Sequence, residues 1–199
     1  MSETPARPAE IRRSYPRSVT LNDGSSLRLR PMVPGDIHRV LAFARSLPAD
    51  DLMFLRVDIT RMIVVMQWAE KIKAGLTVTL LAEKDREVVG YASLHHDQVS
   101  WQRHLGDLRI QVGPEYRGRG LGTALGREMF AIAPDIGIEK MVAQMTADQA
   151  RAIALVERTG FRREALLRDF VIDRDGRKHD LVVMTCDVPG AASAVPAAA

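Results

Sequence analysis

The chain has 199 residues, of which 46% are hydrophobic, so one domain with a sizeable core is expected. Its formal net charge of +3 comes from scattered basic residues, which argues against a nucleic-acid-binding face but suits a small polyanionic ligand. No apolar run approaches a membrane span, Cys186 alone allows no internal disulfide, and no apolar stretch follows the N-terminal charges as in a signal peptide. A cytoplasmic protein without membrane or nucleic-acid partners is expected.

The two ends of the chain differ in composition from its middle. Residues 1–16 are rich in Pro, Arg and Glu without a periodic pattern, and residues 189–199 are nearly all Ala, Pro and Gly. Neither segment offers a regular apolar face, so both are expected to be flexible tails. The folded domain is therefore expected at residues 17–188.

The first half of the domain alternates turn sequences with periodic apolar segments. Asn22-Asp23-Gly24 and the charged residues 84–87 are typical of hairpin turns, and Pro34 is typical of a helix start. The expected elements, in order, are a hairpin at 18–21 and 27–30, a helix at 34–47, helical segments at 52–55 and 59–74, and a hairpin at 77–82 and 88–94. Met62 and Met66 lie on the apolar face of the third helical segment, where they either fill the core or line a flexible binding wall.

The middle of the chain contains a strand, a glycine-rich loop and a helix. Residues 108–112 alternate apolar and polar side chains, which predicts a strand with one buried face. Gly113-Pro114 ends this strand, and apolar residues at helical spacing then predict a helix over 121–132. The remaining expected elements are a strand at 141–145, a helix at 150–158 and a hairpin at 161–170 and 181–186.

Glycines occupy alternate positions of the central loop, at Gly118, Gly120 and Gly122. The first turn of a helix has backbone N–H groups without intrahelical partners, and glycines let an anion approach them, so phosphate binding is one interpretation. The other interpretation is a tight turn whose glycines serve packing only. The spacing excludes both a Walker A loop and the G-x-G-x-x-G dinucleotide fingerprint.

Arg117-x-x-Gly120-x-Gly122 resembles the Q/R-x-x-G-x-G/A signature of the GCN5-related N-acetyltransferases (GNAT), where it also joins a strand to a helix. The resemblance implies an α/β (α+β) GNAT fold over residues 17–188, with a mixed central sheet of about seven strands and about four helices. Local similarity at Tyr15-Pro16 and Asp175-Gly176, among other places, points to the branch that includes bacterial protein lysine acetyltransferases. The residues that the resemblance assigns to acetyl-CoA are Ile110, Gln111, Val112, Arg117, Gly118, Arg119, Gly120, Leu121, Gly122, Thr123 and Gln149.

The resemblance also indicates where the catalytic base should lie. The family often places a Glu five residues before the last valine of the central strand, and Asp107 holds that position here. Asp107 is either this base, acting through a water because its side chain is short, or a turn residue after Leu105-Gly106. His95, His96 and His104 are competing bases, since imidazole titrates near working pH; alternation along a strand allows at most one of the first two to face a site.

Two family positions are occupied by different residue types. Val156 replaces the Tyr that many relatives use as a general acid, and Tyr116 beside the loop is not expected to substitute for it. A thiol with a pKa near 8.5 still leaves as a thiolate, so activity does not require that acid. Gln149 replaces the usual Asn but retains an amide that can reach the cofactor. The resemblance places the oxyanion near the backbone N–H of Gln111 or Val112.

The leading hypothesis is therefore an acetyl-CoA-dependent N-acetyltransferase, with Asp107 as base, no metal, and a homodimer compatible with the family. Its acceptor is a primary amine: a small amine or amino acid, or a protein lysine. One alternative is a catalytically weak acyl-CoA-binding sensor, suggested by Val156 and the short carboxylate. Another is general phosphate or nucleotide binding, which suits the loop but not the order of strands and helices.

Overall fold

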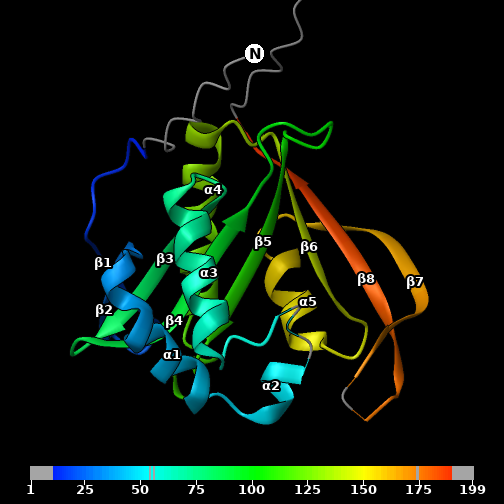
Figure 1. Ribbon diagram of the computed structural model, residues 1–199, viewed down its shortest axis with the longest axis horizontal. Helices are drawn as coiled ribbons and strands as arrows, with labels where there is room; N and C mark the ends of the chain where they lie inside the picture. Colours follow the sequence, from blue (N-terminus) through cyan, green and yellow to red (C-terminus); the bar gives the residue numbers. More distant parts are fainter. Residues whose placement is uncertain (1–10, 54, 56, 174, 190–199) are drawn as a thin grey trace, which may run out of the picture.

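The computed structural model describes residues 11–53, 55, 57–173 and 175–189. Eight strands form one mixed sheet in the order β1-β2-β3-β4-β5-β6-β8-β7 (Figure 1). The strands are β1 (Arg17–Thr20), β2 (Ser26–Pro31), β3 (Thr77–Lys84), β4 (Glu87–His95), β5 (Leu105–Val112), β6 (Lys140–Thr146), β7 (Arg162–Ile172) and β8 (Lys178–Asp187). The α-helices are α1 (Ile37–Ser46), α2 (Ala49–Met53), α3 (Met62–Lys73), α4 (Leu121–Ile132) and α5 (Ala150–Glu157).

The helices cover both faces of the sheet, so the molecule has three layers (Figure 1). Helices α4 and α5 bury their apolar side chains in one cluster with β3, β4, β5, β6 and β8. Helices α1 and α3 bury theirs in a second cluster on the opposite face. The expected α/β (α+β) architecture is confirmed, and the described residues form eight strands and five α-helices in place of about seven and four.

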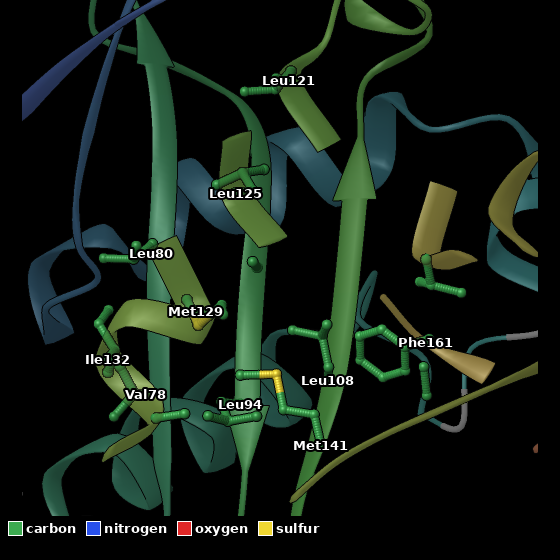
Figure 2. Close-up of a cluster of buried hydrophobic side chains, with 14 of the residues drawn as sticks. Val78, Leu80, Leu94, Leu108, Leu121, Leu125, Met129, Ile132, Met141 and Phe161 are labelled. Atoms are coloured by element: carbon green, nitrogen blue, oxygen red, sulfur yellow. The ribbon is translucent and has the colours of Figure 1, made fainter. Parts of the chain in front are cut away.

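One apolar stripe of α4 contributes the helix side of the cluster beneath it (Figure 2). Leu121, Leu125, Met129 and Ile132 follow the helical period and are all completely buried. They pack against strand side chains such as Leu108, which come from the same face of neighbouring strands. This packing fixes the position of the first turn of α4, to which the glycine-rich loop is attached.

Strand β5 presents different chemistry to the two faces of the sheet. Leu108, Ile110 and Val112 belong to the cluster beneath α4. Asp107 and Arg109, which alternate with them, point to the face that α3 covers, because successive residues of a strand point to opposite faces. The predicted alternation is confirmed, and it places the predicted base on the α3 side.

The three predicted hairpins are present as the antiparallel pairs β1–β2, β3–β4 and β7–β8. The predicted helix at 59–74 is shorter and begins at Met62. Asp58 explains the later start, because its carboxylate accepts hydrogen bonds from the backbone N–H and the hydroxyl of Thr60. Such a turn competes with helix formation. The segment expected at 52–55 corresponds to α2, which starts three residues earlier, at Ala49.

Residues 11–16 of the predicted N-terminal tail are described, and they pack on the α4 side. Ile11 and Tyr15 contact the buried cluster. The Tyr15 hydroxyl donates a hydrogen bond of 2.9 Å to Glu128 of α4, and Arg12 forms an ion pair of 3.0 Å with Asp135. The rest of that tail, residues 1–10, and residues 190–199 of the C-terminal tail lie outside the described residues. Within the described ranges, no helix combines the length and apolar character needed to cross a bilayer.

Candidate active site

The central strands β5 and β6 are paired for only part of their length. They run parallel and pair at Leu105–Asp107 against Lys140–Val142, after which they diverge (Figure 1). Beyond Asp107, β5 continues to Val112 with β4 as its strand partner. Among the described residues, no strand therefore pairs with the β6-facing backbone edge of residues 108–112, and an extended ligand can bind such an edge.

The hydrogen bonds of β4 and β5 determine which groups face this edge. The backbone N–H of Gly113 donates to the carbonyl of Val89 on β4 at 2.9 Å. Since amide direction alternates along a strand, the N–H of Gln111 also points to β4, whereas those of Ile110 and Val112 point away from it. The carbonyl of Val112 accordingly accepts a bond of 3.2 Å from the Arg117 side chain, outside the sheet. Of the two predicted oxyanion donors, Val112 therefore has the orientation that fits.

The glycine-rich loop connects the end of β5 to α4. A short 3₁₀ turn at Pro114–Tyr116 follows the strand, and Gly118 and Gly120 have φ values of +72° and +92°. These left-handed conformations favour glycine. Gly120 is the N-cap of α4, and no side chain caps the first turn. The N–H groups of this turn are thus left without a side-chain cap at the positive end of the helix dipole, an arrangement that suits an anion.

Both arginines of the loop pair with carboxylates from distant segments. Arg117 pairs with Asp51 of α2, and Arg119 pairs with Asp23 of the β1–β2 turn at 2.9 Å. The Arg119 guanidinium also lies over the Tyr116 ring, 5.7 Å from its centroid. The first hairpin and α2 therefore hold the loop in place, and both basic side chains remain at least partly exposed.

The glycines of the loop have different surroundings. A Cβ atom on Gly118 would meet nothing within 4 Å, so its side of the loop is open for a ligand. A Cβ atom on Gly122 would lie 2.8 Å from the Leu155 side chain. Gly122 is thus required where α4 packs closely against α5, in addition to any role of its amide.

Asp107 lies where β5 and β6 separate. It is the last β5 residue of the parallel pairing and is opposite Val142 of β6. Its carboxylate forms an ion pair of 2.8 Å with Arg109, two residues along on the same face. The side chains of Asp107 and Arg109 are 22% and 29% exposed, so a ligand can reach them. Asp107 is thus a strand residue at the gap rather than part of the preceding turn.

The three candidate histidines occupy different environments. His95 of β4 is directly opposite Asp107 of β5, and its Nδ1 lies 2.9 Å from the Thr77 hydroxyl. His96 follows the strand; its Nε2 is buried with no hydrogen-bond partner among the described residues, and this burial lowers the pKa of His96. His104 is exposed in the β4–β5 loop. Of the three, His95 is the one that the sheet places beside Asp107.

Comparison with known proteins agrees with this geometry. The sequence model of the Acetyltransferase (GNAT) family matches residues 44–161, which is more than half of the chain. The chain belongs to the GNAT family. The matched region runs from the last turn of α1 to Phe161, just after α5, and includes the loop and Asp107.

Characterised relatives and solved structures are similar to parts of this GNAT chain. The [Ribosomal protein bS18]-alanine N-acetyltransferase of Escherichia coli is 32% identical over 81 residues, 41% of this chain and 54% of that protein. The chain thus spans about half the length of the first curated relatives it matches. The L-amino acid N-acetyltransferase AaaT of Escherichia coli is 27% identical over 120 residues, 59% of this chain and 73% of that protein. The structure of yncA, a putative acetyltransferase from Salmonella typhimurium with its cofactor acetyl-CoA, shares the fold, with a TM-score of 0.74 at 22% identity over 88% of this chain and 100% of that chain.

Two positions differ in this GNAT chain from the residue types common in the family. Val156 is buried in the cluster beneath α4, where an aliphatic side chain donates no proton. Gln149 is half-buried at the N-cap of α5, just after β6, and its side chain does not cap the helix. Its amide therefore lies in the short connection that follows β6, the strand on the other side of the gap.

Three features of the site were missed in the sequence. Arg109 pairs with Asp107, which the two-residue period of the strand would have revealed. Asp51 pairs with Arg117 from 66 residues away, and no local pattern indicates this. The hydroxyl of Thr146, the last residue of β6, is buried with no hydrogen-bond partner within the described ranges. In the same part of the chain, no group of three or more His, Cys, Asp or Glu side chains is arranged to hold a metal ion.

Proposed function

We propose that this GNAT protein transfers an acetyl group from acetyl-CoA to a primary amine. The observation that carries the proposal is the position of one anion-binding helix N-terminus beside one strand edge that pairs with no strand. A coenzyme A molecule has phosphates and an extended, amide-containing arm. The helix N-terminus suits the phosphates, and the strand edge suits the arm. The presence of acetyl-CoA in the related yncA structure supports the same assignment.

The residues of the loop fit the phosphates of acetyl-CoA. The open side of Gly118 and the uncapped amides of the first turn of α4 offer donors without side-chain obstruction. Arg117 and Arg119 supply positive charge beside the loop. On binding, phosphate oxygens would replace the carboxylates that now pair with the two arginines. The proposed binding residues are Ile110, Gln111, Val112, Arg117, Gly118, Arg119, Gly120, Leu121, Gly122, Thr123 and Gln149.

The proposed reaction is a direct transfer while both substrates are bound. The neutral amine nitrogen attacks the thioester carbonyl, so that a C–N bond forms, the C–S bond breaks, and coenzyme A leaves as a thiolate. Asp107 lies at the gap and promotes removal of the amine proton, directly or through an intervening water or side chain. The backbone N–H of Val112 points away from β4 and is oriented to stabilise the oxyanion. With Val156 at the usual acid position, the thiolate takes its proton from solvent.

An α-amine is the better acceptor for this site. Near neutral pH roughly 0.1% of a lysine amine is neutral, against some tens of per cent of an α-amine, so an α-amine demands less from the base. The two curated relatives described above are named for alanine and for L-amino acids, in agreement with this acceptor class.

Calorimetric titration with acetyl-CoA, followed by an amine panel with a thiol reagent, tests the proposal. The panel contains L-amino acids, a peptide with N-terminal alanine and a peptide with an internal lysine. We expect acetyl-CoA binding and thiol release, with faster release for α-amines. Asp107→Ala should keep binding and lose about 100-fold to 10,000-fold in rate. Asp50→Ala, at an exposed position of α2, is the matched control.

Two other outcomes would change the conclusion. Acetyl-CoA binding without thiol release for any amine would favour an acyl-CoA-binding module without catalysis. An acetyl-CoA affinity that is unchanged in Arg117→Ala would contradict the assignment of the loop, because a lost charged hydrogen bond should weaken binding about 10-fold to 100-fold. Arg127→Ala, on the exposed side of α4, is the control for the second experiment.

A further inference from the structure

A row of polar side chains crosses three neighbouring strands on the α3 face of the sheet. Thr77 of β3 is opposite His95 of β4, and His95 is opposite Asp107 of β5. Directly opposite residues of antiparallel strands have their Cβ atoms about 5 Å apart and point to the same face. The imidazole therefore lies between a hydroxyl and a carboxylate, at the point where β5 and β6 separate.

Thr77 fixes one side of the imidazole. Its hydroxyl lies 2.9 Å from Nδ1 of His95, and Thr77 is only 1% exposed. A buried partner on Nδ1 restricts the ring orientation and selects a tautomer, as carboxylates and carbonyls do for other functional histidines. When Nδ1 donates to this hydroxyl, Nε2 is the ring nitrogen that accepts a proton.

Asp107 is a weak proton acceptor compared with an imidazole. An unperturbed aspartate has a pKa near 3.9, and the Asp107 carboxylate is already paired with Arg109 at 2.8 Å. A general base works best when its pKa is near the working pH, which an imidazole meets at about 6.5. A carboxylate beside an imidazole stabilises the imidazolium that forms when the ring takes a proton.

We propose that His95 accepts the proton of the attacking amine and that Asp107, opposite it, stabilises the resulting imidazolium. The proposal rests on the acetyl transfer proposed above. As the C–N bond forms and the C–S bond breaks, the amine proton passes to Nε2 of His95, directly or through one water. The ring then returns this proton to solvent, and no further reactant is needed. Thr77 is a positioning residue in this arrangement.

The charged residues near His95 on β5 are Asp107, directly opposite it, and Arg109, two residues further along. The α3 side chains buried against this face are Val65, Trp68 and Ala69, which carry no charge. On β3 the flanking residue of the same face is Thr79, and on β6 the residue opposite Asp107 is Val142. The adjoining loop also carries His96, which is half-buried and has a pKa lowered by that burial, and the exposed side chains of Asp97, Arg103 and His104.

The pH dependence of kcat/KM, measured with the fastest amine of the panel, tests the role of His95. We expect the profile of the unmodified protein to have an acidic limb that follows the ionisation of this imidazole. His95→Gln should lower kcat/KM about 100-fold or more and remove this limb, with acetyl-CoA binding retained. His104→Gln is the matched control and should leave the profile unchanged. Thr77→Val should lower kcat more than it raises KM, and Thr77→Ser should restore it.

An NMR titration of the His95 ring gives a second readout that needs no acceptor. Asp107→Asn should lower the titration midpoint of His95, because the imidazolium loses a neighbouring negative charge, whereas Asp97→Asn should leave it unchanged. An unmoved midpoint in Asp107→Asn would overturn the proposed pair. So would retained turnover with an unchanged pH profile in His95→Gln, and in that case the acetyl transfer itself would stand. Thiol release by no amine in the unmodified protein would instead reject the proposed function.

Discussion

The two faces of the sheet are held by different interactions. Beneath α4 the contacts are almost entirely apolar, and the helix stripe from Leu121 to Ile132 is completely buried (Figure 2). On the face of α1 and α3, hydrogen-bonded and charged groups are buried within or beside the apolar cluster. They include a chain from Trp68 through Thr79 to Ser93 and an ion cluster around Asp36.

The face beneath α4 thus mainly stabilises the fold, whereas the face of α1 and α3 carries the groups that can take part in chemistry. The apolar face sets the position of α4 and of its N-terminal loop through packing alone. The other face keeps ionisable groups in fixed positions, and buried polar groups are fixed only while each has its partner. The strand β5 belongs to both faces, since its alternate residues supply apolar contacts to one and the Asp107–Arg109 pair to the other.

The largest effect is expected from Arg30→Met in the ion cluster. Arg30 bonds Asp36 and Glu83 at 2.6 Å, and both carboxylates are 5% exposed. Burial raises the pKa values of Asp36 and Glu83, but the bonds to Arg30 outweigh this effect and hold both pKa values below their ordinary values. Removal of the cation leaves two buried carboxylates with less compensation and should cost about 3–5 kcal/mol. Chemical denaturation at pH 7 measures this loss.

The same variant should lose less at acidic pH. A carboxylate with a lowered pKa contributes stability above its unfolded pKa, and this contribution disappears as the pH falls through the folded pKa. The difference between Arg30→Met and the unmodified protein should therefore shrink towards pH 3. Arg28→Met, at an exposed position of the same strand, is the control and should change stability by less than about 0.5 kcal/mol. A loss that is independent of pH would contradict the electrostatic explanation.

The apolar face should respond to Leu125→Ala with a loss of about 2–5 kcal/mol, because the side chain is completely buried and leaves a cavity. Unfolding in denaturant measures the loss, which should depend little on pH. Arg127→Ala on the same helix is exposed and serves as the control. A pH-dependent loss in Leu125→Ala would remove the distinction between the two faces.

Thr79→Val tests the hydrogen-bonded chain at nearly constant volume. The Thr79 hydroxyl accepts from Trp68 Nε1 at 3.0 Å and lies 2.8 Å from the Ser93 hydroxyl. Its removal leaves two buried polar groups without this partner and should cost about 1–3 kcal/mol. The exposed Thr20→Val is the control. If Thr79→Val is as stable as the parent in thermal unfolding, these hydrogen bonds do not contribute to the stability of this face.

The smallest effect is expected at His179 in the β7–β8 hairpin. Its ring contacts Asp173 at 2.9 Å and Asp148, before α5, at 3.3 Å. The bond to Asp173 raises the pKa of His179 despite some burial. The resulting stability is complete below the unfolded pKa of about 6.5 and is lost as the pH rises through the folded pKa. His179→Gln should therefore lower the Tm at pH 5.5 and have less effect at pH 8.5; the reverse order would contradict this sign.

Local features of the chain could be predicted from the sequence. The alternation of residues 108–112, the helical period of 121–132 and the turn residues of three hairpins depend on neighbours in the chain, and the structure has all of them. The bounds of the loop could also be predicted, because the apolar pattern changes from the strand period to the helical period between β5 and α4. The start of α3 was less predictable because the Asp58 turn competes with an apolar helical pattern.

The relations across the sheet could not be predicted in the same way. The position of Asp107 opposite His95 depends on the register between β4 and β5, and that register is set by packing on both faces. Alternation along β4 could say only that His95 and His96 do not share a face. The pairing of Arg117 with Asp51 and of Arg119 with Asp23 depends on segments that are distant in the chain.

Alternate amides of β5 differ in their surroundings. The N–H of Gln111 points to β4, whereas those of Ile110 and Val112 point to the side on which β6 has diverged. In hydrogen–deuterium exchange, neighbouring residues of this one strand should therefore take up deuterium at different rates. Addition of acetyl-CoA should slow the faster set and leave the other unchanged. In this one strand, the amides of Ile110 and Val112 would thus report acetyl-CoA binding, and the neighbouring amide of Gln111 would serve as the reference.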